Sequence, residues 1–365
     1  MNVCIIGEGL TSLSLAKNLL NKKINVHIYH KNNVEKLSSN RTIGISKNNL
    51  EFFNNEIQKI PKKSYWEIKK IEIYSDKLDK ENILQFENNK NDLFYIVKNN
   101  ELYELLRKKI SKNKFFKKIK IKDDFFYEDL LKKKKYDLII NCDPNNLLSK
   151  KYFTKKIKKN YYNIAYTTIL KHKKIVNNVA SQVFTKYGPI AFLPISNIKT
   201  SIVCSLDIKN RKYKDNEIED LIIQNNPKYE IKKISNLSSF ELISSSLRNY
   251  HHKNILAFGD LLHKIHPLAG QGFNMTIRDI KILSKIIKIR TDLGIQLDSS
   301  ILDIFEKETK TKNFLFSSSV DFIYEVFNLD KKVKSKSFNK ILRMFGKNKN
   351  LTDYFIKLAD RGLNF

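Results

Sequence analysis

The sequence predicts an α/β protein in which one strand–helix–strand unit is combined with a mixed β-sheet and a helical C-terminus. An apolar run at residues 2–6, leucines at helical spacing and a second apolar run at 24–29 predict the strand–helix–strand unit. Short alternating segments at 66–94 and 160–208 are typical of antiparallel strands. Between 300 and 365 apolar residues recur at helical spacing among many lysines, which predicts a basic helical region.

Two glycines follow the first predicted strand. In GEGLTS, Gly7 and Gly9 lie between strand and helix, where a tight turn lets a pyrophosphate approach the N–H groups of the helix N-terminus. Ser12 takes the third position of this pattern and is small enough for close contact between helix and strand. The spacing predicts dinucleotide binding, with an unliganded strand–helix turn as the alternative. The acidic ribose ligand expected at the end of the second strand is absent, because His30 stands there.

The stretch from 255 to 280, ILAFGDLLHKIHPLAGQGFNMTIRDI, predicts a strand, a loop and a helix. Asp260 ends the strand, and its carboxylate could accept a hydrogen bond from a ribityl or ribose hydroxyl. Gly270 and Gly272 let the backbone approach a flat ligand, and the free N–H groups of the following helix favour negative charge. A reduced flavin carries such charge, so the stretch predicts a flavin-binding loop.

These residues resemble a known family. GDLLHKIHPLAGQGFN is similar to the second FAD motif of the class A aromatic-ring hydroxylases with the p-hydroxybenzoate hydroxylase fold, especially the ubiquinone-biosynthesis branch. Further matches are GEGLTS, RTIGIS, FYIVKNNELYELL, the strand that ends at Asp143, and NNVASQVFTKYGPIAFLPI. The resemblance implies that the cofactor-binding residues are Gly7, Gly9, Ser12, Arg41, Gly259, Asp260, Pro267, Gly270, Gln271, Gly272, Phe273 and Asn274.

The resemblance also implies a reaction. A tightly bound FAD is reduced by NAD(P)H and reacts with O₂ to give a C4a-hydroperoxyflavin, which hydroxylates the aromatic ring of a polyprenyl-phenol precursor of ubiquinone. No catalytic side chain is assigned, because the flavin carries the chemistry and the loop Pro267, Gly270, Gln271 and Gly272 positions its ring. Two alternatives stay open: a non-catalytic flavin-binding or scaffold subunit that works with other ubiquinone-synthesis proteins, and a flavin reductase or dehydrogenase of the same fold.

The implied fold is a Rossmann-like FAD-binding domain interleaved with a mixed β-sheet substrate domain. We expect the FAD-binding domain at 1–65, 92–150 and 250–295, the substrate domain at 66–91 and 151–249, and a helical C-terminal region at 296–365. The strands between 180 and 200 would form the floor of the substrate site. Besides Ser12 and His30, the sequence departs from the family at Pro144, which follows Asp143, and at Leu261 and Leu262.

The composition restricts the partners. The formal charge of +30 comes from 68 Lys and Arg against 38 Asp and Glu. It reflects either compositional drift or a binding patch for a polyanionic partner, such as nucleic acid or an anionic membrane surface. Only 8 of these 68 residues are Arg, the residue that reads bases and phosphates bidentately, so no nucleic-acid partner is expected. The ten glycines cannot build a second glycine-rich strand–helix turn, which disfavours two separate nucleotide domains.

The remaining signals concern the compartment and two weaker motifs. Cys4, Cys142 and Cys204 lie in apolar strand-like runs, which indicates a reducing compartment, and no run of 18 apolar residues occurs, so we expect a cytoplasmic protein that touches membranes peripherally. His263 and His266 have a metal-compatible spacing, but loop packing against the flavin is favoured and no metal is expected. An apolar stripe on the C-terminal helix fits either a membrane surface or packing on the core: Phe316, Val320, Ile323 and Phe327.

Overall fold

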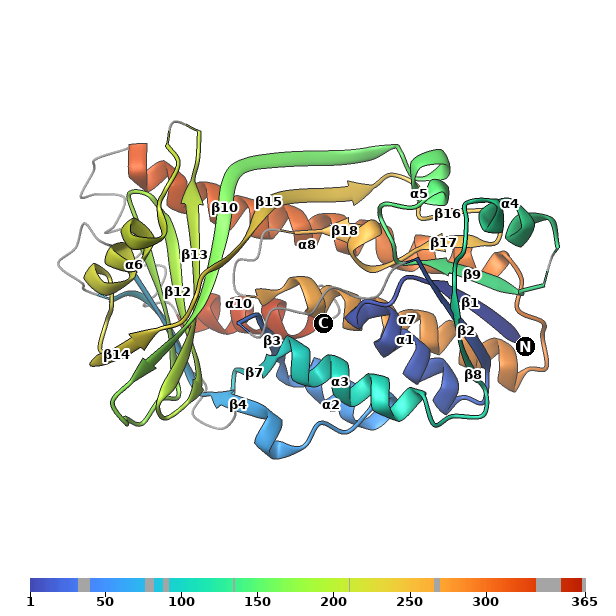
Figure 1. Ribbon diagram of the computed structural model, residues 1–365, viewed down its shortest axis with the longest axis horizontal. Helices are drawn as coiled ribbons and strands as arrows, with labels where there is room; N and C mark the ends of the chain where they lie inside the picture. Colours follow the sequence, from blue (N-terminus) through green and yellow to red (C-terminus); the bar gives the residue numbers. More distant parts are fainter. Residues whose placement is uncertain are drawn as a thin grey trace.

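The structure is a computed structural model that describes residues 1–31, 40–75, 82–87, 92–133, 135–209, 211–265, 270–332 and 349–362. Figure 1 shows a parallel sheet at one end, a larger sheet at the other, and the long helix α8 (Ser300–Lys332) running past both. A small antiparallel sheet of β3 (Thr42–Ser46), β7 (Phe94–Lys98) and β4 (Tyr65–Ile68) lies between them. The predicted α/β class, with a mixed sheet and a helical C-terminus, is confirmed.

The parallel sheet has six strands in the order β16-β17-β9-β1-β2-β8. Neighbouring strands are parallel except for β16 and β17. Residues 3–6 of β1 are at most 1% exposed, so the strand is buried on both faces and its sequence is a continuous apolar run. The strands are β1 (Asn2–Ile6), β2 (Asn25–His30), β8 (Phe116–Lys120), β9 (Leu138–Asn141), β16 (His251–His252) and β17 (Ile255–Ala257).

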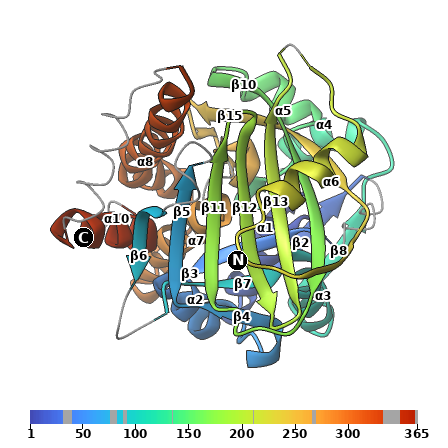
Figure 2. The ribbon, with the colours of Figure 1, turned by 90° about the vertical axis from the view of Figure 1, so that its left-hand side faces the viewer.

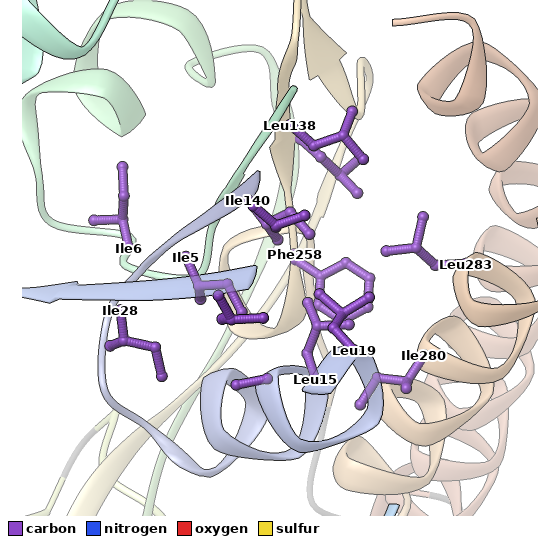
Figure 3. Close-up of a cluster of buried hydrophobic side chains, with 14 of the residues drawn as sticks. Ile5, Ile6, Leu15, Leu19, Ile28, Leu138, Ile140, Phe258, Ile280 and Leu283 are labelled. Carbon is purple, nitrogen blue, oxygen red and sulfur yellow. The ribbon is translucent and has the colours of Figure 1, made fainter. Parts of the chain in front are cut away.

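Two helices pack together against the parallel sheet: α1 (Leu10–Asn21) and α7 (Gly272–Asp292). Figure 3 shows Leu15 and Leu19 of α1 and Ile280 of α7 around Phe258, and all four side chains are fully buried. Burying one such side chain stabilises the fold by about 1.5–3 kcal/mol. The other helices are α2 (Lys47–Phe52) with a π-turn (Phe53–Ile57), η2 (Lys62–Ser64), α3 (Asn99–Ile110), α4 (Phe125–Lys132), α5 (Leu147–Tyr152), α6 (Asp215–Gln224), η3 (Gly259–Leu261) and α10 (Lys349–Arg361).

The larger sheet has nine strands in the order β18-β15-β10-β13-β12-β11-β5-β6, with β14 beside β10. All pairs are antiparallel except β11 with β5. Figure 2 shows α6 lying across this sheet, on which it buries Ile218 and Ile222. The strands are β5 (Lys70–Ser75), β6 (Asn82–Glu87), β10 (Lys156–His172), β11 (Val179–Thr185), β12 (Gly188–Ser196), β13 (Lys199–Asp207), β14 (Ile231–Ile234), β15 (Ser238–Leu247) and β18 (His263–Lys264).

A Gly-Pro pair is typical of turns, but Gly188 and Pro189 lie in β12, just after the turn that joins it to β11. The chain reverses at 186–187, and Gly188 is already the first residue of β12. A Cβ built at Gly188 would lie 1.8 Å from the carbonyl oxygen of Ser205 on the neighbouring strand. Glycine is therefore required at 188 because two backbones approach closely in the sheet, and the turn itself is formed by the residues before it.

The apolar stripe of the C-terminal helix faces the protein. Phe316 and Val320 of α8 are 5% and 7% exposed and pack with Met275 of α7 and Leu358 of α10. The packing interpretation is confirmed for these two residues, while Ile323 is only partly buried. Helical periodicity alone cannot tell a core from a bilayer. The Phe327 side chain lies outside the described residues. Among the helices that the structure describes, none is long and apolar enough to cross a bilayer.

Candidate cofactor-binding site

The carboxyl ends of four parallel strands meet along one side of the sheet, which we call the carboxyl edge. Ile6 at the end of β1 pairs with Tyr29 of β2 and Asn141 of β9, and Asn141 also pairs with Ala257 of β17. The turns that follow β1, β9 and β17 therefore lie side by side. Ligands of open α/β sheets bind outside such an edge, at the N-termini of the helices that follow the strands.

The first turn presents an uncapped helix N-terminus. Gly7 has a φ of +108°, which L side chains rarely adopt, and its N–H donates to the Tyr29 carbonyl at 2.8 Å. No side chain caps α1 at Gly9, and the first turn carries no acidic residue. A Cβ built at Gly9 would meet no atom within 4 Å, and Ser12 is fully buried. The N–H groups of α1 and the positive end of its dipole thus remain available to an anionic group, as the sequence predicts.

The turn after β17 packs directly on α1. Gly259 has a φ of +62°, and a Cβ there would lie 2.6 Å from Cγ2 of Thr11. Asp260 is exposed and lies near Cys142, the residue after β9. Burial, together with the nearby negative charges of Asp260 and Asp143, raises the pKa of the Cys142 thiol to about 12. Two predicted residues, Gly259 and Asp260, are therefore brought to the same edge as the Gly7–Gly9 turn.

The start of α7 provides a second uncapped helix N-terminus. No side chain caps α7, and its first turn carries no acidic residue. A Cβ built at Gly272 would meet no atom of the described residues within 4 Å, whereas one at Gly270 would lie 3.3 Å from the backbone nitrogen of Gly44 in β3. Gln271 is 9% exposed, and its Oε1 has no hydrogen-bond partner in the part of the chain that the structure describes. Pro267, also predicted for the site, lies outside the described residues.

Asn274 serves as a brace between α7 and β3. Its side chain is 1% exposed and donates to the Gly44 carbonyl at 2.9 Å. Its Oδ1 accepts from the Ser46 backbone N–H at 2.9 Å and from Asn49 Nδ2 at 3.0 Å. Phe273 packs near Phe53, with ring centroids 6.4 Å apart. These two predicted residues therefore hold the start of α7 in place with contacts inside the protein.

Arg41 lies beside the larger sheet. Its side chain is exposed, and its guanidinium lies 5.5 Å from the ring centroid of Phe240 in β15. The next residue, Thr42, donates from its hydroxyl to Ser201 of β13 at 2.9 Å. Arg41 thus marks the place where β3 meets the larger sheet, and its predicted role toward FAD remains a proposal.

The departure at Asp143 and Pro144 is accommodated by a turn built on asparagines. Asn141, fully buried, donates to Ser149 Oγ at 2.9 Å and accepts from Asn146 Nδ2 at 2.7 Å. Asn146 caps α5 by accepting from the Ser149 backbone N–H at 2.9 Å. Asp143 accepts from the Asn145 backbone N–H at 2.8 Å. Pro144 therefore lies in an ordered turn at the carboxyl edge.

His263 also has a partner inside the protein. Its Nε2 contacts Oδ2 of Asp279 on α7, and both side chains are buried. The second carboxylate oxygen of Asp279 accepts from Asn313 Nδ2 of α8 at 3.0 Å. His263 lies in the short strand β18 and not in the predicted loop, because its residues pair with β15, and its predicted packing against the flavin remains a proposal. His266 lies outside the described residues.

One buried charged cluster at the carboxyl edge was missed by the sequence analysis. Glu8, between the two glycines of the first turn, is 8% exposed. Its Oε1 accepts from Lys118 Nζ of β8 and, at 3.3 Å, from the Tyr103 hydroxyl of α3, while Oε2 lies 3.6 Å from His30 Nδ1. The signal available in the sequence was an acidic residue inside a glycine turn, where an anion is expected to bind.

The sequence matches the FAD binding domain family over residues 148–311. Among curated proteins it is 27% identical to the ubiquinone biosynthesis monooxygenase COQ6 of Dictyostelium discoideum, over 40% of this chain and 37% of that protein. It is 28% identical to the 3-demethoxyubiquinol 3-hydroxylase of Escherichia coli K12, over 40% of this chain and 39% of that protein. The chain thus spans less than half the length of these curated relatives.

Solved structures of the same fold cover nearly the whole chain. The p-nitrophenol 4-monooxygenase PnpA of Pseudomonas putida superposes with a TM-score of 0.75 at 11% identity, covering 98% of both chains. HpxO of Klebsiella pneumoniae, complexed with FAD, superposes with a TM-score of 0.72 at 11% identity and the same coverage. The chain therefore has the fold of the FAD-dependent monooxygenases, and its sequence resembles the FAD-dependent hydroxylases of ubiquinone biosynthesis.

Proposed function

We propose that this chain is an FAD-dependent monooxygenase that hydroxylates the aromatic ring of a polyprenyl-phenol precursor of ubiquinone, with NAD(P)H and O₂ as co-substrates. The observation that carries the proposal is the pair of uncapped helix N-termini with glycines that face open space, Gly9 at α1 and Gly272 at α7. Figure 1 shows both helices running away from the larger sheet, with their first turns toward the middle of the molecule. An elongated ligand with two electron-rich parts fits this arrangement.

The residues present fit FAD. The N–H groups at the start of α1 would hold the pyrophosphate, and Asp260 would accept a hydrogen bond from a sugar hydroxyl. The start of α7, with Gly270, Gln271 and Gly272, would lie against the flavin ring and stabilise negative charge on it. When bound, FAD supplies the redox and oxygen-activating chemistry, and the protein contributes position and electrostatics.

The substrate side of the proposal rests on the relatives. Those named above are a ubiquinone biosynthesis monooxygenase and a demethoxyubiquinol hydroxylase, so a polyprenylated phenol is the substrate class that we propose. The larger sheet, with the strands between 180 and 200, would form the floor of the substrate site. The predicted division into an FAD-binding domain (1–65, 92–150, 250–295), a substrate domain and a C-terminal region is part of the same proposal.

The cofactor is tested first. The purified protein is expected to be yellow and to release FAD, with no FMN, on denaturation, because the α1 turn provides a pyrophosphate site that only a dinucleotide fills. Protein that stays colourless after addition of FAD would rule out the enzyme.

The reaction is tested by complementation. Strains that lack one ring hydroxylation of ubiquinone synthesis would each receive this chain, and the quinone intermediates would be identified by mass. Gain of one oxygen supports the monooxygenase, and loss of two hydrogens supports a dehydrogenase of the same fold. Bound FAD without any product supports a scaffold subunit, an alternative kept open by His30, which replaces the expected ribose acid.

We further propose a peripheral, salt-sensitive contact with an anionic membrane, which would present the prenylated substrate. The described part of α8 exposes Phe314, Leu315 and Phe322, at 47%, 48% and 69%, in a chain of net charge +30. Washing a membrane pellet with high salt should release the protein. Retention through the wash would contradict the proposal and indicate apolar insertion.

A further inference from the structure

The carboxyl edge lacks an acid at the end of β2 but has one in the turn before α1. In dinucleotide-binding folds, a carboxylate at the end of the second strand accepts a hydrogen bond from the adenosine ribose. Here His30 occupies that place. The Glu8 carboxylate comes from the β1–α1 turn and reaches the same strand end, with Oε2 3.6 Å from His30 Nδ1. The acid thus comes from a different position in the sequence, Glu8, but its carboxylate lies close to the end of β2, where the ribose acid is expected.

The Glu8 carboxylate is only half satisfied. Oε1 accepts from Lys118 and Tyr103. Oε2 is buried and has no hydrogen-bond partner within the described chain, since His30 Nδ1 is beyond hydrogen-bond distance. A buried carboxylate oxygen without a donor is costly, so such oxygens in folded proteins are nearly always paired. The geometry calls for a donor at Oε2, and a sugar hydroxyl is a donor.

Lys118 and Tyr103 explain how an acid can lie beside an expected pyrophosphate. A free carboxylate there would repel the phosphates. The ammonium of Lys118, whose side chain is 41% exposed, offsets this charge, and the Tyr103 hydroxyl fixes the orientation of the carboxylate. Both partners bind the same oxygen, Oε1, and leave Oε2 without a hydrogen-bond donor among the described residues.

We propose that Glu8 is the ribose ligand of this protein: its Oε2 accepts a hydrogen bond from a hydroxyl of the adenosine ribose of FAD and replaces the acid missing at position 30. This inference rests on the proposed FAD-binding function. Glu8 is a binding residue that selects for the adenosine half of the cofactor, and Lys118 and Tyr103 position it.

The test compares three ligands in fluorescence titrations of the full-length apoprotein: FAD, an FAD analogue with 2′,3′-dideoxyadenosine, and FMN, which has no adenosine. The parent protein should bind FAD about tenfold or more tightly than the dideoxy analogue, because a charge-assisted hydrogen bond is lost. Glu8→Ala should weaken FAD binding by a similar factor, bind FAD and the analogue equally, and leave the affinity for FMN unchanged.

Two further variants keep the test informative. Glu8→Gln preserves the shape and an acceptor for Tyr103, so it should fold even if Glu8→Ala does not, and its preference for FAD over the analogue should fall several-fold. Lys118→Met removes the ion-pair partner but keeps the carboxylate, so it should retain the preference for FAD.

The outcomes separate the inference from the function on which it rests. If Glu8→Ala or Glu8→Gln weakens FAD, the analogue and FMN by one common factor, Glu8 only supports the fold and the inference is overturned. Equal binding of FAD and the analogue by the parent protein overturns it as well. If the parent protein binds no flavin at all, the proposed function itself fails.

Discussion

Two turns at the carboxyl edge begin with a glycine and an acidic residue: Gly7-Glu8 after β1 and Gly259-Asp260 after β17. They differ in whether the buried polar side chains around them have partners within the protein. Around the β1–α1 turn, the buried Glu8 still has one carboxylate oxygen without a partner in the described chain. Around the β17–α7 segment, the buried polar side chains have hydrogen-bond partners within the protein. Asn274 pairs with the backbone of β3, and Asp279 pairs with His263 and with Asn313 of α8. Under the proposed function, the first turn would face a ligand. The second segment would combine ligand-facing groups, including Gln271, whose Oε1 has no partner in the described chain, with side chains that hold the fold together.

The glycines of the second segment show the same division. A Cβ at Gly259 would collide with Thr11, so this glycine is required by packing within the protein. A Cβ at Gly272 would meet no atom of the described residues within 4 Å, so packing against this part of the chain does not require glycine there. Within the 255–280 segment, Gly259 is thus needed for packing and Gly272 is not. Replacing Gly259 should therefore lower stability, whereas replacing Gly272 should affect ligand binding.

Asn274→Leu should have the largest effect and should act on folding. It removes the side chain that pairs with the Gly44 carbonyl and the Ser46 N–H, and it leaves these buried groups without partners. We expect a loss of about 3–5 kcal/mol in the free energy of unfolding, measured by urea denaturation of the apoprotein. Lys285→Ala, at an exposed position of the same helix, should change it by less than about 0.5 kcal/mol. If Asn274→Leu were as stable as the parent protein, the Asn274 side chain would not hold α7 against β3, and the contrast between the two turns would fail.

Gly259→Ala and Gly272→Ala should separate packing from ligand approach. The alanine at 259 combines a φ of +62° with the contact to Thr11, so we expect a loss of about 2–3 kcal/mol in unfolding free energy. Adding Thr11→Ala should restore part of it by removing the two closest contacting atoms. Gly272→Ala should leave stability unchanged, and the bulkier Gly272→Val should exclude flavin or bind it with a shifted spectrum. Equal loss of stability in Gly259→Ala and Gly272→Ala would contradict the distinction.

Asp260→Ala should act on the cofactor and spare the fold, because Asp260 is exposed. Loss of one charge-assisted hydrogen bond to a sugar hydroxyl should cost about 1.5–3 kcal/mol in FAD binding, or about one to two decades in affinity. FAD titration gives the affinity, and turnover at saturating FAD shows whether chemistry is retained. If Asp260→Ala and Gly272→Val both bind FAD and turn over like the parent protein, the 255–280 segment is not the flavin site.

The smallest effect concerns Cys142, which lies between the two turns. Because burial raises its pKa to about 12, the thiolate is scarce at pH 8, and alkylation should be about a thousandfold slower than for an ordinary cysteine. The rate should rise as pH approaches the raised pKa. Asp260→Ala removes one of the nearby negative charges, so it should speed the labelling slightly. Mass spectrometry of iodoacetamide-treated protein measures this, and rapid labelling of the folded parent at pH 8 would show that the edge is more open than the structure indicates.

The local elements were predictable because their causes are local. Helical spacing placed the helix after Gly272, continuous apolar residues placed β1 in the core, and the glycines of GEGLTS predicted an uncapped helix start. The resemblance of HPLAGQGFN led to the fold, which the solved structures bear out. Residue type and spacing carry this information because backbone conformation and burial periodicity depend on neighbours within a few residues.

Only the tertiary structure decided which of these polar side chains pair within the protein and which are left without a partner in the described chain. Asn274 pairs with residues more than 220 positions away, and Glu8 meets Tyr103 and Lys118 through strands and helices about 100 positions along the chain. The apolar stripe of α8 was ambiguous for the same reason, since core and membrane impose one periodicity. The class of fold and the approximate position of the helices and strands follow from the sequence by itself, whereas the partner of each polar side chain depends on how distant segments meet at the carboxyl edge.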